Sequence, residues 1–448
     1  MNEIPQSLLT DLYEFRMVDS YLQLGMCETA VFEFFVRRLP PTRQFLLAAG
    51  LEQALDYALG LAWSAQEIAW LQRACRLSDR AAEYLSRFQF SGDIDAMPEG
   101  TPFFADEPIV RVTAALPEAQ LLESRLMNIL HYQTLIASKA ARCRLVAADR
   151  LLIDFGLRRA HGGEAGLWAA RASFIGGFDG TATVAAGRAY GIPVFGTMAH
   201  SYVQAHDSET QAFADFLRTS GGPTTLLVDT YDTLRGVERA ADAARAEEQR
   251  SGERRLQAIR IDSGDLVQLA QGARAILDAR GLRKTQIFCS GSLDEYAIAQ
   301  ALAQSAPIDG FGVGTNLDVS ADAPALDCAY KLQEYAGKPR RKRSVAKSTW
   351  PGAKQVWRRY GADGRACGDT IALATEELPG EPLLRAVVRN GRRLQPAPDL
   401  AAIRSHARAA IERLPPALLS LDNRVPYRIE VSAALQRLAD RCDAVTAC

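Results

Sequence analysis

The stretch LQAIRIDSGD (Leu256–Asp265) decides the fold class of this chain, because it joins a short apolar run to acidic residues. Runs of this kind, each followed by a helical pattern, are typical of strands in parallel sheets. The arrangement occurs six times in the middle of the chain. The six runs end at Asp154, Thr197, Asp229, Asp262, Ser290 and Gly314. Steps of 24 to 43 residues separate these ends. Because this is the spacing of βα units, the pattern predicts a parallel sheet.

Each predicted strand ends in a polar or small residue. That is expected of a (β/α) barrel, whose chemistry lies at the carboxyl ends of its strands. A doubly wound open sheet is the alternative, although it does not require functional residues on every strand. We therefore predict an α/β protein with an irregular (β/α) barrel of the TIM-like type.

The two ends of the 448-residue chain lack this alternation. Near the start, TDLYEFRMVDSYLQLG predicts a helix and VFEFFVRR a strand. Beyond residue 316, YKLQEY and KQVWRRYG predict antiparallel strands, and RVPYRIEV predicts a strand that closes the chain. We expect residues 1–125 and 326–448 to form one α/β sandwich domain, and residues 126–325 to form the catalytic barrel.

Composition excludes several classes of protein. A net charge of −1, with 48% hydrophobic and 23% charged residues, indicates a globular protein and argues against a general nucleic-acid binder. The first residues lack a signal-peptide pattern, and no apolar stretch reaches the roughly 18 residues that span a bilayer. The eight cysteines are scattered, which excludes a zinc ribbon and gives no disulfide framework. We expect a cytoplasmic protein that binds neither nucleic acid nor membranes.

One basic run, KPRRKRSVAK (Lys338–Lys347), stands out from this near-neutral background. Such runs are usually solvated faces or nucleic-acid patches. Because no aromatic residues are interleaved, binding of a polyphosphate substrate explains the run better.

Two successive runs end in glycine-rich loops, FCSGSLDEY and GFGVGTNL. Glycines let backbone N–H groups approach an anion, and the loops after the last strands of a barrel commonly hold a phosphate. Tight turns alone would also require glycines. The candidate phosphate-binding residues are Ser290, Gly291, Ser292, Gly312, Gly314 and Thr315.

The segment IRIDSGDL places Arg260, Asp262 and Asp265 at one strand end. Its carboxylates could hold Mg²⁺ or accept hydrogen bonds from ribose hydroxyls. Alternatively, Asp262 or Ser263 could cap the helix that follows.

The segment DFGLRRAHGG places Arg158 and Arg159 at another strand exit. Guanidinium groups suit carboxylate or pyrophosphate oxygens. Adjacent arginines do not easily face inward together, so one of them is expected to be structural. Phe155 is a candidate for either the core or the site.

Two of the five histidines, His200 and His206, lie six residues apart in VFGTMAHSYVQAHDSE. They lack the i, i+4 spacing of helical zinc ligands, and no HExxH pattern is present. His200 follows a predicted strand end, level with the other polar clusters, whereas His206 is expected on a helix or its surface. We therefore treat His200 as the chemical candidate and His206 as a structural residue.

Taken in order, these motifs resemble those of the nicotinate phosphoribosyltransferase family, a group of type II phosphoribosyltransferases. The resemblance runs from LLTDLYEFRM through FEFFVRRLP, PEGTPFF, DFGLRRAHG, GTMAHS, RIDSGDL, FCSGSLDEY and GFGVGTNL to YKLQEYAGKPRRKRSVAKST and PGAKQVWR. It covers roughly residues 7 to 360.

This resemblance implies that nicotinate and phosphoribosyl pyrophosphate react to give nicotinate mononucleotide and pyrophosphate, with hydrolysis of ATP, in NAD salvage. It implies Mg²⁺ as cofactor, ATP as co-substrate, and a homodimer with active sites at the interface. The histidine of the family's GT-x-AH motif is phosphorylated by ATP, and His200 stands at that position. A relative acting on nicotinamide or another aromatic acid, and a non-catalytic ligand sensor, are the alternatives.

The resemblance also implies roles for individual residues. Tyr13 would cover one face of the pyridine ring from the partner subunit, and Phe155 would stack on the other. Arg158 would pair with the nicotinate carboxylate or the pyrophosphate.

Further roles concern phosphates and ribose. Arg260 and Asp262 would hold the ribose and the Mg²⁺-pyrophosphate, and the loops of Gly291 and Gly314 would hold the 5′-phosphate. The residues implied in binding other phosphates or ATP are Arg37, Lys342 and Lys347. The chain departs from the family at Ala182, where a polar residue is common, and at Ala346, where a glycine is usual.

Overall fold

The computed structural model describes residues 5–344, 347–421 and 425–445. The chain divides into two compact units, each with its own sheets and helices. Unit 1 comprises Met1–Ser138 and Ala325–Cys448, and unit 2 comprises Lys139–Pro324. No helix in the described part of the chain is long and apolar enough to cross a membrane.

Unit 2 is built on a six-stranded parallel sheet with the order β7-β6-β11-β10-β9-β8. Its strands are β6 (Leu151–Asp154), β7 (Gly180–Thr181), β8 (Thr224–Leu227), β9 (Leu256–Ile261), β10 (Gln286–Ser290) and β11 (Gly310–Val313). The last strand of the series, β11, pairs with the first, β6. A barrel requires this pairing, because it brings the two ends of a βα series together.

Residues 193–197 lie between the two edge strands, β7 and β8. Val194 forms an isolated parallel bridge with Thr181 of β7. On the other side, Thr197 Oγ1 donates a hydrogen bond of 2.6 Å to the carbonyl oxygen of Thr225 in β8. The predicted irregular barrel is therefore confirmed, and the doubly wound order is excluded.

The structure differs from the sequence analysis at two of these strands. The segment IPVFGTMAH forms a single bridge and not a strand, because Pro193 has no N–H to donate and Gly196 has no side chain to pack. Strand β7 was not predicted, because a strand of two residues is too short to display a period.

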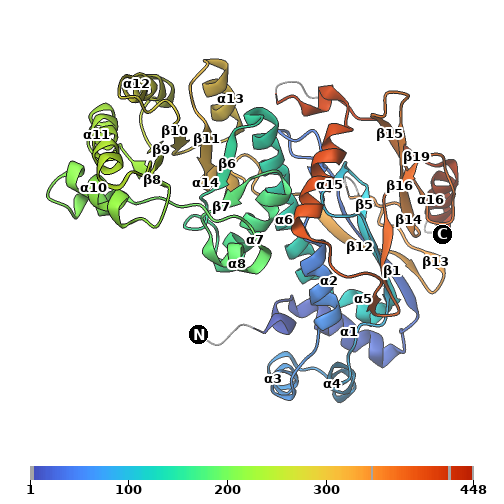
Figure 1. Ribbon diagram of the computed structural model, residues 1–448. Coiled ribbons are helices and arrows are strands. Elements are labelled where there is room, and N and C mark those ends of the chain that lie inside the picture. Colours follow the sequence, from blue (N-terminus) through green and yellow to red (C-terminus); the bar gives the residue numbers. More distant parts are fainter. Residues whose placement is uncertain (1–4, 345–346, 422–424, 446–448) are drawn as a thin grey trace. The chain divides into compact units, whose positions relative to one another are not determined.

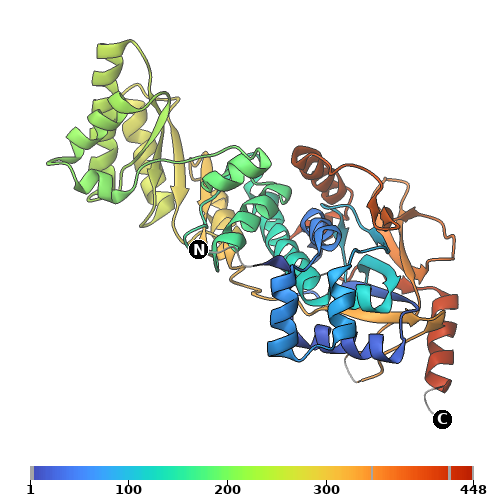
Figure 2. The same ribbon diagram turned by 90° about the horizontal axis from the view of Figure 1, so that it is seen from below.

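Helices connect the strands of unit 2 and cover the outside of the curled sheet. For example, α11 and α12 lie together against β9 and β10 (Figures 1 and 2). The helices are α7 (Gly163–Ile175), α8 (Val184–Tyr190), α9 (His200–Gln204), α10 (Glu209–Thr219), α11 (Thr233–Ser251), α12 (Leu266–Ala279), α13 (Glu295–Ala303) and α14 (Thr315–Asp318). The long helix α6 (Glu123–Ala147) contains residues of both units.

The start of α12 corrects a further expectation. Asp265, not Asp262 or Ser263, is the N-cap of this helix, and its Oδ1 accepts from the backbone N–H groups of Val267 and Gln268 at 3.1 Å each. Because Asp265 supplies the cap, the helix does not require the Asp262 carboxylate.

Unit 1 combines the two ends of the chain. Its main sheet has the order β13-β12-β1-β5-β3-β17-β18, and a second sheet has the order β16-β14-β15-β19. The strands of unit 1 are β1 (Thr29–Val36), β2 (Leu46–Leu47), β3 (Asp93–Ala96), β4 (Pro102–Phe103), β5 (Pro108–Ala115), β12 (Cys328–Tyr335), β13 (Lys338–Pro339), β14 (Lys354–Tyr360), β15 (Ala366–Leu373), β16 (Glu381–Pro382), β17 (Arg385–Arg389), β18 (Arg392–Arg393) and β19 (Ile429–Val431).

Strand β1 explains why the two ends of the chain fold together. Seven of its eight residues are buried, and it lies between β5 and β12, so both of its edges are paired. Phe32 of β1 stacks on Tyr330 of β12 with ring centroids 5.0 Å apart. The α/β domain predicted from the N- and C-terminal parts is therefore confirmed.

The helices of unit 1 are α1 (Leu12–Leu24), α2 (Leu51–Gly60), α3 (Ala65–Cys75), α4 (Asp79–Ser86), α5 (Leu116–Gln120), α15 (Leu400–Glu412) and α16 (Ala433–Val445). Helix α4 packs against both α1 and α3, and Figure 1 shows these three helices, in blue, near one another at the bottom of the view. The prediction that a strand closes the chain is wrong. RVPYRIEV contains β19, which pairs in parallel with β15, and α16 follows it.

Candidate active site

The carboxyl ends of β9 and β10 bring together three of the predicted site residues. Arg260 Nε donates to Ser290 Oγ at 2.7 Å, and Arg260 Nη2 donates to Asp262 Oδ1 at 2.6 Å. Ser290 Oγ in turn donates to the same Asp262 oxygen at 2.5 Å. Adjacent parallel strands present their ends at one edge of the sheet, which is why residues 28 positions apart in sequence meet here.

This cluster favours the ionised form of Asp262. Burial raises the pKa of its carboxyl, but the hydrogen bond from Ser290 and the charge of Arg260 outweigh that effect. The pKa therefore lies below its ordinary value of 3.8. The charge of His200 acts in the same direction, so this histidine is within electrostatic range of Asp262.

Gly291 is required where the loop after β10 passes β9. Its φ is +98°, and a Cβ there would lie 2.0 Å from the Asp262 carbonyl oxygen. Only glycine permits both this conformation and this approach. The predicted phosphate loop is therefore packed against the backbone of Asp262.

Asp229, expected from the sequence only as a strand end, supports the cluster from the loop after β8. Its Oδ2 accepts from the Asp262 backbone N–H at 2.9 Å and from Ser263 Oγ at 2.7 Å. Its Oδ1 is buried without a hydrogen-bond partner among the described residues. The signal that could have identified it was the acidic residue at the end of TTLLVD, in step with Asp262 in the next unit.

His200 begins α9, directly after the segment that spans β7 and β8. It is half-buried, and its Nδ1 lies 3.1 Å from Thr230 Oγ1, which follows β8. This contact engages one ring nitrogen. Nε2 has no hydrogen-bond partner in the part of the chain that the structure describes.

His206 has a different environment. Its Nδ1 donates to the Tyr202 carbonyl oxygen at 2.8 Å, its ring lies 4.7 Å from that of Tyr202, and its Nε2 lies 3.7 Å from Asp215. These contacts tie it to α9 and α10. No group of three or more His, Cys, Asp or Glu residues within the described ranges could hold a metal ion.

Phe155 follows β6 and lies close to the arginine of the cluster. The Arg260 guanidinium is 5.0 Å from the centre of the Phe155 ring, and the Phe288 ring is 5.8 Å from it. A Cβ at Gly312 would lie 2.5 Å from the Phe155 ring, so this glycine makes room for the aromatic side chain. The glycines of β11 thus position a ring as well as a loop.

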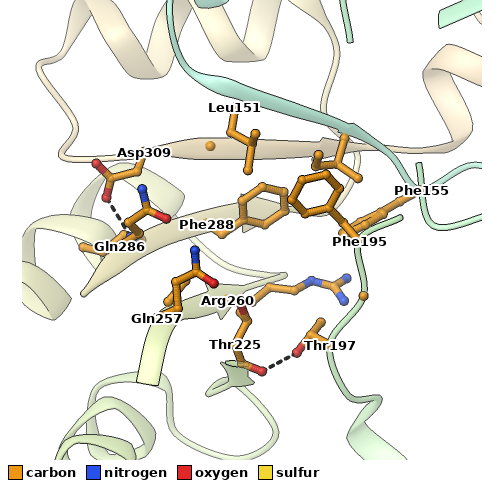
Figure 3. A pocket seen from close by; sticks show the side chains of 15 residues that line it. Leu151, Phe155, Phe195, Thr197, Thr225, Gln257, Arg260, Gln286, Phe288 and Asp309 are labelled. Atoms are coloured by element: carbon orange, nitrogen blue, oxygen red, sulfur yellow. Dashed lines mark hydrogen bonds between the residues drawn. The ribbon is translucent and has the colours of Figure 1, made fainter. Parts of the chain in front are cut away.

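The interior of the barrel contains a cavity of about 70 Å³ behind this ring (Figure 3). Phe155, Phe195 and Phe288 gather at one end of the cavity, and Gln257, Gln286 and Asp309 at the other. Arg260 lines it from β9.

The remaining predicted residues of unit 2 lie on loops. Arg158 and Arg159 are exposed after Phe155. Gly314 precedes the short helix α14, which begins at Thr315. A Cβ at Gly314 would lie 3.0 Å from the Phe155 carbonyl oxygen, so the loops after β6 and β11 are in contact.

Four predicted residues belong to unit 1. Tyr13 lies on α1 and is 41% exposed, and burial raises the pKa of its hydroxyl to about 12. Arg37 Nη1 donates to Asp327 Oδ1 at 3.1 Å. Lys342 and Lys347 are exposed on the basic segment, and Ala346 is outside the described residues.

Three sequence profiles match the chain. Residues 8–131 match the nicotinate phosphoribosyltransferase (NAPRTase) N-terminal domain, residues 150–348 the NAPRTase family, and residues 379–439 the C-terminal domain. Nicotinate phosphoribosyltransferase pncB2 of Mycobacterium tuberculosis is 48% identical over 429 residues, which are 95% of this chain and 91% of that protein. Nicotinate phosphoribosyltransferase of Bacillus subtilis is 41% identical over 389 residues, 85% of this chain and 78% of that protein.

Solved structures are similar along nearly the whole chain. Human nicotinic acid phosphoribosyltransferase matches with a TM-score of 0.84 at 29% identity, over 97% of this chain and 99% of that one. Nicotinate-nucleotide pyrophosphorylase from Pyrococcus furiosus matches with a TM-score of 0.76 at 25% identity, over 92% of this chain and 97% of that one.

Proposed function

The chain belongs to the nicotinate phosphoribosyltransferase family, and from this premise we propose how its residues carry out the reaction. It is an enzyme of NAD salvage that transfers a phosphoribosyl group to nicotinate. The products are nicotinate mononucleotide and pyrophosphate, and hydrolysis of ATP accompanies the transfer. The predicted barrel of residues 126–325 is the catalytic domain.

The observation that carries this mechanism is the cluster of Arg260, Asp262 and Ser290 at the carboxyl ends of β9 and β10. Asp262 accepts hydrogen bonds from the ribose hydroxyls, and Arg260 faces the pyrophosphate. The nicotinate ring nitrogen forms a bond to the anomeric carbon of the ribose, and the bond from that carbon to pyrophosphate breaks. The departing oxygen takes the electron pair. Because the ring nitrogen attacks with its own lone pair, no general base is needed. Catalysis then depends on the orientation of the two substrates and on electrostatic stabilisation of the leaving pyrophosphate.

Mg²⁺ fits this cluster through Asp262. Both hydrogen bonds to the Asp262 carboxylate reach Oδ1, which leaves Oδ2 without a partner in the described part of the chain. Mg²⁺ usually binds one or two carboxylates together with substrate phosphates, so one available carboxylate oxygen suffices. When bound, the ion would neutralise charge on pyrophosphate.

The nicotinate site follows from the loop after β6. Phe155 stacks on the pyridine ring, and Arg158 pairs with the carboxylate that distinguishes nicotinate from nicotinamide. The backbones of the Gly291 and Gly314 loops, with Thr315, bind the 5′-phosphate. Asp265, the N-cap of α12, is assigned to substrate binding as well, and Gly312 leaves space for the Phe155 ring.

His200 is the phosphoryl acceptor. Its Nδ1 is engaged with Thr230, so Nε2 attacks the γ-phosphorus of ATP, and ADP leaves with the electron pair of the broken bond. The resulting phosphohistidine places negative charge near Asp262, which changes affinity for the substrate and product phosphates. The residues proposed to bind phosphates from unit 1 are Arg37, Lys342 and Lys347.

We further propose that the protein is a cytoplasmic homodimer in which Tyr13 covers the nicotinate ring of the partner. On α1, Leu12 and Tyr13 are each 41% exposed and Leu24 is 70% exposed, which leaves apolar surface for a second copy. Light scattering should give the mass of a dimer, and Leu24→Glu should lower it.

Activity is tested with nicotinate, phosphoribosyl pyrophosphate, Mg²⁺ and ATP. Nicotinate mononucleotide should form, and Arg260→Ala should lower kcat/KM by at least about 100-fold because it removes the charge that stabilises the leaving group. Arg283→Ala, at an exposed arginine before β10, is the control. If no mononucleotide forms, the proposed function is wrong.

The phosphohistidine is tested with γ-labelled ATP. Label should reach the wild type and His206→Asn, and His200→Asn should take up none. His206 is a matched control, because it is in the same segment but is bound to α9 and α10. Incorporation of label into His200→Asn would contradict the assignment of His200 as the phosphoryl acceptor.

A further inference from the structure

Two buried carboxyl groups lie directly beneath the loop that carries Phe155 and Arg158. Asp154 ends β6 and is 0% exposed, and Asp318 ends α14 and is 1% exposed. Both carboxyl groups lie against Gly156, whose backbone N–H donates to Asp154 Oδ1 at 2.8 Å and whose Cα faces the Asp318 carboxyl. Two buried carboxyl groups that lie this close do not readily ionise together, so one of them keeps its proton.

The partners of Asp154 decide which group holds the proton. Its Oδ1 accepts from the Gly156 backbone N–H at 2.8 Å, and its Oδ2 accepts from Thr181 Oγ1 at 2.7 Å. The Thr181 oxygen itself accepts from the Thr183 backbone N–H at 3.0 Å, so its hydroxyl proton points to Asp154. Both oxygens of Asp154 therefore accept hydrogen bonds, as those of a carboxylate do, which leaves the retained proton to Asp318.

The pair also fixes the path of the loop. A Cβ at Gly156 would lie 2.0 to 2.3 Å from the Asp318 carboxyl atoms, so the backbone at Gly156 rests directly on this group. Gly156 is the residue between Phe155 and the segment of Arg158. The same pair thus contacts the loop after β6, strand β7 through Thr181, and the helix that follows the Gly314 loop.

We propose that Asp154, as a carboxylate, and Asp318, as a neutral acid, share one proton and together position the Phe155–Arg158 loop for nicotinate. The assignment of nicotinate to this loop rests on the proposed function. Both aspartates are positioning residues, because neither touches the substrate.

The electrostatic surroundings agree with one retained proton. Burial, and then the charge of Asp154, raises the pKa of Asp318 well above its ordinary value, and burial also raises the pKa of Asp154. From β7 the group that faces Asp154 is the neutral Thr181 hydroxyl. Helix α7 packs against α14, and its buried cation Arg171 lies 5.9 Å from the centre of the Tyr190 ring. Asp322, beyond α14, is paired with Lys139 at 2.8 Å.

Asparagine should have opposite effects at the two positions. In Asp318→Asn the amide still donates to Asp154, so KM for nicotinate should stay within about 3-fold of the wild type. In Asp154→Asn the Thr181 hydroxyl loses its acceptor, and in Asp318→Ala the donor is lost. Each of these two should raise KM for nicotinate by about 10-fold or more, with a smaller change in KM for phosphoribosyl pyrophosphate.

A pH series provides a second measurement. A raised pKa means that the folded protein keeps the proton at neutral pH and loses it as the pH rises. The wild type should therefore show an alkaline rise in KM for nicotinate, which Asp318→Asn should lack because an amide does not ionise in this range. Thermal unfolding of both proteins from pH 6 to pH 10 should show the same difference. That second comparison does not depend on which substrate the enzyme uses.

These outcomes separate the proposal from the function on which it rests. Equal damage by Asp318→Asn and Asp318→Ala, or no effect of Asp154→Asn, would overturn the shared proton. A parallel loss of kcat for both substrates with unchanged KM values would overturn the positioning role. Failure of the wild type to form nicotinate mononucleotide would overturn the function instead, while the unfolding comparison would still test the pair.

Discussion

Asp262 is held in its ionised form by two residues that reach it in different ways. Arg260 lies two residues before it, in β9, whereas Ser290 belongs to the adjacent strand β10. The sequence identified all three residues, because each stands at the end of an apolar run. It did not identify Asp229 or Asp318, whose roles depend on contacts between elements far apart along the chain.

Gly291 offers a direct test at the residue scale. Gly291→Ala should lower kcat/KM for phosphoribosyl pyrophosphate by about 100-fold, because a methyl group 2.0 Å from the Asp262 carbonyl oxygen must displace one of the two loops. Gly221→Ala is the matched control, since a Cβ there meets nothing within 4 Å. Steady-state kinetics should give kcat/KM for both variants. Equal values would contradict the close approach of Gly291 to the Asp262 carbonyl oxygen.

Glu14 gives a pH-dependent prediction. Burial raises the pKa of this carboxyl on α1 from 4.5 to about 7. A raised pKa contributes stability that is complete below about pH 4.5 and is lost as the pH rises through 7. The free energy of unfolding should therefore fall by on the order of 3 kcal/mol between pH 4.5 and pH 8 from this group. Glu14→Gln should remove this part of the slope in urea titrations, and an unchanged slope would exclude Glu14 as its source.

At the scale of elements, the segment 193–197 closes the barrel with few contacts. One backbone bridge joins it to β7 and one side-chain hydrogen bond joins it to β8, and His200 follows three residues later. The sequence predicted a strand here because apolar residues precede the polar end. A proline and a glycine reduce the strand to one bridge, and the periodicity of so short a segment does not reveal this.

Thr197→Val tests the closure. Losing the hydrogen bond to the Thr225 carbonyl oxygen should reduce stability by about 1 kcal/mol and slow phosphorylation of His200. Thr219→Val, which removes a hydroxyl bound to the Asp215 carbonyl oxygen on the exposed surface of α10, should leave phosphorylation unchanged. Rates of label uptake from ATP measure both, and equal rates in the two variants would refute the role of Thr197.

At the scale of the whole molecule, the chain leaves unit 1, forms the barrel and returns. Lys354 of β14 is 2% exposed and its Nζ lies 2.7 Å from Glu33 of β1, so residues more than 300 positions apart form one buried ion pair. The sequence predicted that the two ends share a domain. It did not predict this pair, because nothing local distinguishes Glu33 or Lys354 from surface residues.

Glu33→Ala should therefore destabilise unit 1 by about 3 to 5 kcal/mol, because it leaves the Lys354 ammonium buried without its partner. Arg38→Ala, which removes an arginine whose side chain is 76% exposed from its pair with Asp327, should cost at most about 1 kcal/mol. Chemical denaturation of both variants provides the comparison. Similar losses would show that the buried pair contributes no more than a surface one.

The sequence by itself determined the (β/α) series, the split domain and the strand-end residues, because strand periodicity and spacing are local properties of a chain. Only the tertiary structure decided which strand ends meet, how residues 193–197 close the barrel, and that Asp154 and Asp318 lie together. The physical reason is that the protonation state of a buried carboxyl group and the conformation of a loop depend on burial and on hydrogen bonds between segments far apart in the sequence. In the sequence, Asp318 has no feature that distinguishes it from other residues. The pairing of β6 with β11 places it beneath the loop of Phe155.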